Sequence, residues 1–122
     1  MGITYNFELN QIICLEHEET RLYAEVIQIV QTRHLCWARP LMLAVSPLHP
    51  DIVAKPPILY DLRQGADLLW PLSLFRPALD TEVVSQLAQL QATKAQSGGC
   101  QIAHRQLSLF IRQVWQAHQT KF

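Results

Sequence analysis

The residues of this chain that could support catalysis are its histidines and cysteines, and their spacing matches no catalytic or metal motif. The segment 17–21 (HEETR) begins like the zinc motif HExxH, but the second histidine is missing where the metal would need it. The five histidines and three cysteines share no ligand spacing, and no Gly-rich phosphate-binding motif is present. We therefore expect no catalytic residue, no cofactor and no metal site.

The cysteines point to structural thiols in a reducing compartment. Cys36 stands beside Trp37 in an apolar run, whereas a reactive thiolate needs an electropositive, partly exposed setting, so Cys36 is expected to be an inert core thiol. Cys100 follows two glycines and is the better candidate for an exposed thiol. An odd number of cysteines without CxxC spacing indicates no disulfide framework, so we expect a cytoplasmic protein.

Opposite charges flank a predicted turn over residues 60–67. Asp61 and Arg63 can pair with each other, and Asp67 can bond the turn backbone. The alternative is that Arg63 belongs to a partner-binding loop.

The segment 70–77 concentrates large side chains between prolines. Trp70, Phe75 and Arg76 stand there. They either plug one end of the core or form an exposed contact site, since aromatic residues and Arg are enriched where interfaces bind most strongly.

The last predicted helix carries further candidate contacts. Its apolar stripe follows a 3.6-residue period through Ala103, Leu107, Phe110, Ile111, Val114 and His118. Trp115 lies off the centre of that stripe, and Arg105 and Arg112 stand seven residues apart on nearly the same side. An off-stripe Trp with nearby Arg predicts a docking surface; the alternative is that Trp115 only widens the apolar face.

The hydrophobic period changes near Pro77 and predicts an α+β fold. Alternation with a period of two indicates antiparallel strands over 3–9, 12–15, 21–31, 35–45, 58–62 and 67–70, followed by a helical turn at 71–75. The later period predicts two helices between 80 and 119, broken at 96–99, and Asp80 or Thr81 can cap the first. Residues 1–122 are expected to form a single domain, with 1–76 as the strand-rich unit.

Two architectures fit this order: an SH3-like small barrel, or an open antiparallel sheet with both helices across one face. Pro40 cannot donate a ladder hydrogen bond, so it marks a sheet edge or a bulge. Trp37 shares its strand parity with Leu35, Leu41 and Leu43, which predicts that Trp37 is a core residue.

A net charge of zero conceals a gradient. Residues 1–82 hold all ten acidic residues against six basic ones, and residues 83–122 hold four basic residues and no acidic one. Either the basic end packs on the acidic part of its own chain, or it forms a docking surface of one sign. The acidic strand region does not favour nucleic acid, and no apolar run approaches the ~20 residues of a membrane helix, so no membrane-spanning segment is expected.

Four stretches, 19–27, 35–41, 60–65 and 74–80, resemble a group of short cyanobacterial proteins without an assigned function. The resemblance spans roughly residues 19–80 and carries over no site residues. It implies a cytosolic setting in a photosynthetic bacterium, beside a photosynthetic assembly.

These patterns predict a non-enzymatic module for protein–protein interaction or assembly, which binds another protein or forms a homo-oligomer. The alternatives are an RNA-binding small β-barrel and an enzyme whose site the sequence does not reveal. The predicted contact residues are Arg63, Trp70, Phe75, Arg76, Arg105, Arg112 and Trp115.

Overall fold

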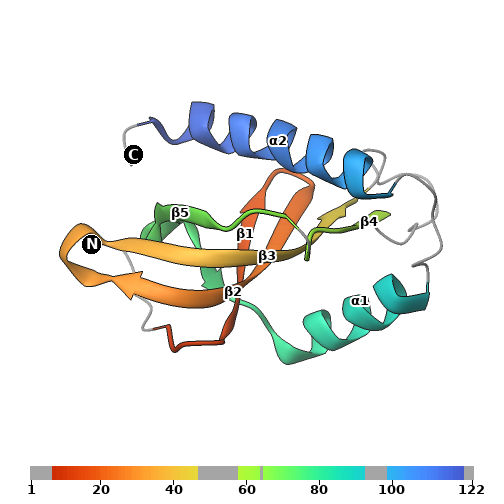
Figure 1. Cartoon of the computed structure of the whole chain (residues 1–122), viewed down its shortest axis with the longest axis horizontal. Coiled ribbons are helices and arrows are strands. Elements are labelled where there is room, and N and C mark those ends of the chain that lie inside the picture. The colour runs from red at the N-terminus through yellow and green to blue at the C-terminus, as the bar shows by residue number, and fades with distance from the viewer. Residues whose placement is uncertain (1–6, 47–57, 64, 93–98, 120–122) are drawn as a thin grey trace.

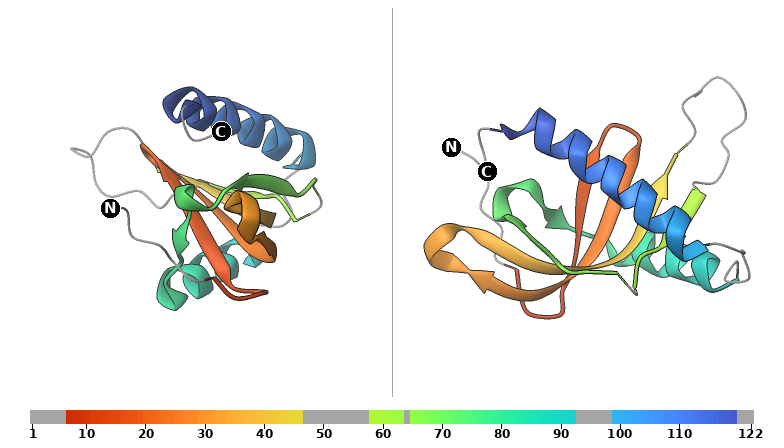
Figure 2. Two further views of the ribbon diagram at one scale, coloured as in Figure 1. Left: turned by 90° about the vertical axis from the view of Figure 1, so that its left-hand side faces the viewer. Right: turned by 45° about the horizontal axis from the view of Figure 1, so that its top comes forward.

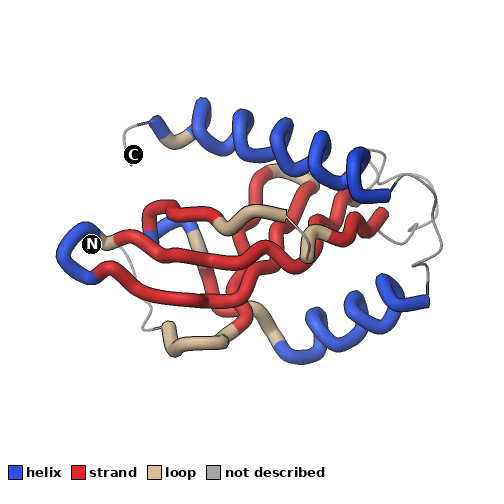
Figure 3. The backbone as a smooth tube through the Cα atoms, viewed as in Figure 1, coloured by secondary structure: helices blue, strands red, loops and turns tan. Residues whose placement is uncertain are grey.

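The computed structural model describes residues 7–46, 58–63, 65–92 and 99–119, and it shows an antiparallel sheet followed by two helices (Figures 1 and 3). The predicted α+β class is therefore confirmed. In chain order the elements are β1 (Ile12–His17), β2 (Thr20–Val30), the 3₁₀ turn η1 (Gln31–Arg33), β3 (Leu35–Val45), β4 (Ile58–Asp61), β5 (Leu68–Pro71), the 3₁₀ turn η2 (Leu72–Leu74), β6 (Arg76–Pro77), α1 (Asp80–Ala92) and α2 (Gly99–Ala117).

Strand β3 lies at the centre of the sheet. It pairs with β2 on one side, and on the other side residues 42–45 pair with β4 and residues 35–38 pair with β5. Strands β4 and β5 therefore lie end to end along one edge of β3. Strand β1 joins β2 to the short β6. Within the described residues no pairing links β6 to β4 or β5, so the sheet is not closed and the SH3-like barrel is not confirmed.

The two helices cover opposite faces of the sheet (Figures 1 and 2). Helix α2 packs on the face that holds Leu22 and Leu43, and α1 packs Val83 on the face that holds Tyr23 and Met42. The alternative in which both helices lie across one face is wrong. Neighbouring residues of a strand point to opposite faces, and here both neighbours are buried and apolar, so each face needs a cover.

A β-bulge, one of the two alternatives predicted from Pro40, interrupts the alternation of β3. Tyr23 of β2 pairs with Met42, but the next residue, Ala24, pairs with Pro40, so Leu41 is one residue too many. An extra residue moves every later side chain to the other face of the sheet. Two odd-numbered residues of β3, one before Leu41 and one after it, therefore lie on opposite faces of the sheet, and the same holds for two even-numbered residues.

This bulge overturns the prediction for Trp37. Cys36 lies in the α2-side core together with Leu43, although the two differ in parity. Trp37 follows Cys36 and so points to the opposite face, where its side chain is 40% exposed. Trp37 is not a core residue.

Most other predicted elements are confirmed to within one or two residues. Residues 7–9 form no strand, and the remainder of the strand expected at 3–9, like the loop at 47–57 and the break at 96–98, lies outside the described residues. At the start of α1, the backbone N–H of Leu79 donates to Glu82 Oε1 at 3.1 Å. Glu82, rather than Asp80 or Thr81, thus supplies the described cap.

Candidate functional site

A groove of about 490 Å³ lies between β5 and the C-terminal half of α2. We call it the β5–α2 groove, and its lining residues are Leu69, Trp70, Ser108, Ile111, Arg112 and Trp115. It brings together three of the seven predicted contact residues, Trp70, Arg112 and Trp115. The sequence pattern of α2 identified two of them, and the sheet places the third opposite.

The periodicity of α2 explains which side chains line this groove. Leu107, Phe110 and Val114 are buried against the sheet. The residue after each of them lies about 100° further around the helix. Ser108, Ile111 and Trp115 therefore share the flank of α2 that faces β5.

The described residues that line the groove are mostly apolar, and one of them, Arg112, is a cation. Trp70 is 8% exposed, whereas Leu69 and Trp115 are 55% and 48% exposed. Arg112 is exposed, and none of the ion pairs within the described residues includes it. None of the described residues that line the groove carries a carboxylate. The groove can therefore offer apolar surface and one cation to a partner.

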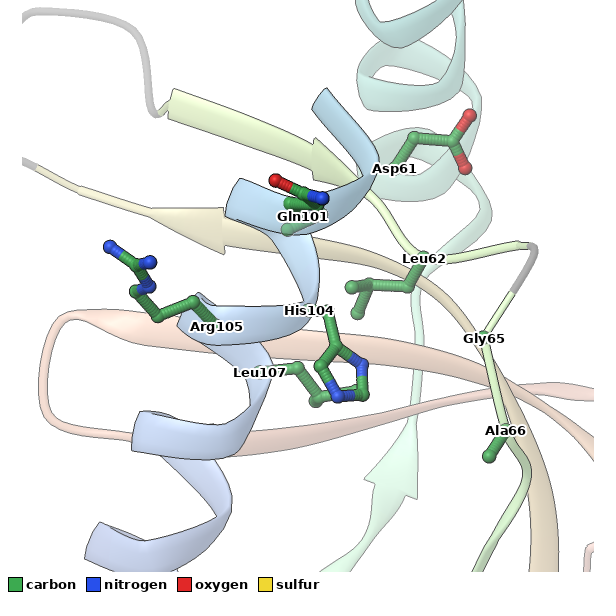
Figure 4. Close-up of a pocket in the computed structure, with 9 residues that line it drawn as sticks. Asp61, Leu62, Gly65, Ala66, Gln101, His104, Arg105 and Leu107 are labelled. Atoms are coloured by element: carbon green, nitrogen blue, oxygen red, sulfur yellow. The ribbon is translucent and has the colours of Figure 1, made fainter. Parts of the chain in front are cut away.

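A second hollow, of about 580 Å³, lies nearer the start of α2 on the same flank (Figure 4). The ring of His104 extends from α2 beside Leu107, on the side of the helix that faces Gly65 and Ala66, and Arg105 projects on the other side of the helix. Arg105 is exposed and, like Arg112, has no ion pair within the described part of the chain. It adds positive charge to the outer surface of α2.

Arg63 is engaged by its neighbour Asp61. The Nε and Nη2 atoms of Arg63 donate to the two carboxylate oxygens of Asp61 at 3.0 and 2.8 Å. These hydrogen bonds outweigh partial burial and lower the pKa of Asp61. The prediction that Asp61 and Arg63 pair locally is confirmed.

Among the described residues Asp67 makes no hydrogen bond to the turn backbone, where one was predicted. Its carboxylate accepts hydrogen bonds from Trp37 Nε1 at 2.9 Å and from Arg39 Nε at 3.2 Å. The bond from Trp37, followed by that from Arg39, lowers the pKa of Asp67. Sequence reasoning missed this contact. Pro40 was the one residue in the sequence that could have indicated the contact, because a bulge beside it turns Trp37 out of the core.

Arg76 serves the protein's own structure. Its Nη1 donates to Glu82 at 3.1 Å and its Nε donates to Glu16 at 2.7 Å, which joins β6 to α1 and β1. Arg21 approaches the same two carboxylates at 3.7 Å. Burial disfavours the charge on Arg76, but the bonds to Glu82 and Glu16 outweigh it and raise the pKa of Arg76.

Trp70 and Phe75 are buried, at 8% and 2% exposure, in the core beneath α2. Their placement matches the interpretation in which this segment plugs the core, and it corrects their assignment as exposed contacts. Trp70 still reaches the β5–α2 groove with part of its side chain.

Two thiols are held in their protonated form. Burial raises the pKa of Cys14 to about 12 and that of Cys36 to about 11. The prediction that Cys36 is a buried core thiol is confirmed. Within the described residues no group of three or more His, Cys, Asp or Glu side chains is placed to hold a metal ion. None of the helices described is long and apolar enough to cross a membrane.

Comparisons of the chain with protein-family models, with curated proteins and with solved structures find no match. The resemblance to short cyanobacterial proteins stays a prediction.

Proposed function

We propose that this protein is a non-enzymatic interaction or assembly module that binds a partner protein through the β5–α2 groove. The observation that carries the proposal is the position of Trp115. It is half exposed at a shallow, largely apolar groove, beside an Arg that has no ion pair in the described structure. Trp and Arg in such positions supply a large share of binding energy at protein interfaces.

The placement of the other candidates narrows the proposed surface. Arg63 and Arg76 are satisfied by Asp61, Glu16 and Glu82, and Phe75 is buried. Arg112 and Trp115 remain at one site, with Arg105 on the outer side of the same helix. A cytoplasmic location and a setting near a photosynthetic assembly belong to this proposal as predictions.

A double variant that removes the Trp115 ring and reverses the charge of Arg112 tests the proposal. The double variant Trp115→Ala/Arg112→Glu should keep the thermal melting temperature of the wild type within a few degrees, because both side chains are exposed. The same variant should lose the partners that the wild type captures from native lysate, identified by mass spectrometry.

Two matched controls lie outside the groove. Leu109 is exposed to nearly the same extent as Trp115, at 47%, but lies on the other flank of α2. Arg33 is exposed on η1. Leu109→Ala and Arg33→Glu should retain the partners. Capture that survives the groove variant, or a collapsed melt, would contradict the proposal.

A further inference from the structure

Resting on this proposed function, we infer that the β5–α2 groove binds a short extended segment of the partner that carries an acidic side chain next to an aromatic or aliphatic anchor. Three independent features of the groove determine this occupant: its apolar lining, its charge and the free edge of β5.

The apolar lining calls for an anchor side chain. Leu69 and Ile111 form opposite sides of a groove that reaches Trp70, and Trp115 borders it with half of its surface exposed. A volume of about 490 Å³ is large enough for an aromatic or leucine side chain. Burying such a side chain would also remove exposed surface of Trp115 from water.

The charge calls for an acidic neighbour to that anchor. Arg112 lines the groove without an ion pair among the described residues, and residues 83–122 contain no acidic residue. The carboxylate nearest to β5 in sequence, Asp67, is already occupied by Trp37 and Arg39. A carboxylate from a partner would therefore meet an unopposed guanidinium, with which it can form two parallel hydrogen bonds.

The free edge of β5 calls for an extended backbone. Among the described residues β5 pairs with β3 alone. The N–H of Leu72 donates to the carbonyl of His34 at 2.8 Å. In antiparallel pairing alternate residues bond the neighbouring strand, so Trp70 bonds β3 while the N–H and C=O of Leu69 point to the free edge.

Pro71 limits this pairing to a short stretch. It has no N–H, so the edge offers one complete donor–acceptor pair, at Leu69, and a long strand cannot add there. A brief extended segment, held mainly by its side chains, fits both the edge and the groove.

RNA fits these features less well. A single strand needs several cations and stacking platforms along its path, whereas the described lining of this groove holds one Arg and one exposed Trp. The chain as a whole carries no net charge that would attract a polyanion.

A random nine-residue peptide library displayed on phage tests the inference on the full-length chain. Selected peptides should share an Asp or Glu within two or three positions of Trp, Phe or Leu. By fluorescence anisotropy, Arg112→Glu and Trp115→Ala should each weaken a selected peptide at least tenfold, and Leu109→Ala should leave its affinity unchanged. Replacing the acidic residue of the peptide by its amide should weaken wild-type binding severalfold, with no further loss on Arg112→Glu.

Other outcomes separate this inference from the proposed function. Selected peptides that lack acidic residues but still depend on Trp115 would overturn the acidic partner and leave the groove as a protein-binding site. Failure to select any peptide would overturn the extended segment, and the lysate capture would then decide the proposed function alone. Peptides that bind equally to the groove variants would contradict both.

Two further measurements test whether RNA or a second copy of this chain occupies the groove instead. Fluorescein-labelled twelve-nucleotide oligouridine that binds the wild type and is lost on Arg112→Glu would identify RNA as the occupant and overturn the inference. A dimer in size-exclusion chromatography that Arg112→Glu dissociates would identify a second copy of this chain and overturn it as well. We expect neither.

Discussion

The indole Nε1 of Trp37 donates a hydrogen bond of 2.9 Å to the carboxylate of Asp67, thirty residues away in the chain. Arg39 donates to the same carboxylate. Asp67 stands directly before β5, and Trp37 pairs across the sheet with Leu69 of that strand. The contact therefore ties the start of β5 to β3 on the face opposite α2, and so it supports one wall of the β5–α2 groove.

Trp37→Phe should lower the free energy of unfolding by only about 0.5–1 kcal/mol, because the hydrogen bond lies at an exposed position where water competes. Trp37→Ala should cost less than the ~3–5 kcal/mol typical of a buried Trp. Urea unfolding of both variants measures this. A loss as large as that of a core truncation would contradict the outward orientation of the ring.

Trp70 and Trp115 should respond in opposite ways to truncation. Trp70→Ala removes a buried ring from beneath α2 and should cost about 3–5 kcal/mol. Trp115→Ala removes a half-exposed ring and should cost less than about 1 kcal/mol, while it abolishes partner capture. Chemical denaturation of the two variants beside Phe75→Ala, a second core truncation, gives the comparison. Equal losses at positions 70 and 115 would show that Trp115 serves the core.

The carboxylate of Glu82 should make stability sensitive to acid. Burial alone would raise the pKa of Glu82, but hydrogen bonds from Arg76 and from the backbone of Leu79 lower it below its ordinary value of 4.5. A carboxylate with a lowered pKa stabilises the fold above its unfolded pKa, and that stability disappears as the pH falls through the folded value.

The advantage of the wild type over Glu82→Gln should therefore be largest near pH 7, at about 1 kcal/mol, and should shrink between pH 5 and pH 3. Guanidinium unfolding at several pH values measures it. Glu18→Gln, at an exposed carboxylate on the β1–β2 turn, serves as the control variant. A gap between wild type and Glu82→Gln that does not vary with pH would contradict the ion-pair geometry.

Cys14 and Cys36 should resist thiol reagents in the folded protein. Both side chains are fully buried and their pKa values are raised to about 12 and about 11, so little thiolate forms at pH 8. In a Cys100→Ser variant, Ellman's reagent should label neither thiol on the timescale of minutes until guanidinium unfolds the chain, and then both. Rapid labelling of the native variant would show that the core opens more readily than its packing implies.

The candidate site was partly readable from the sequence. The helical period alone identified Arg112 and Trp115 as residues beside the buried stripe of α2, because that period depends only on local geometry. It could not show that Trp70 and Leu69 lie opposite them, since β5 reaches that position by pairing with a strand more than thirty residues earlier. Arg76 and Phe75 were misassigned because a Pro-bounded aromatic segment reads the same whether it is buried or exposed.

The sequence by itself determined the α+β class, the bounds of β3 and the inward stripe of α2, since all three follow from local hydrophobic period and turn residues. Only the tertiary structure decided which face Trp37 occupies, where the sheet stays open and which face each helix covers. Bulges arise from strand pairing between distant segments, and one inserted residue at Leu41 inverts the faces of β3. The central strands are buried and apolar on both sides, so both faces need a cover, and the local pattern does not assign a helix to either one.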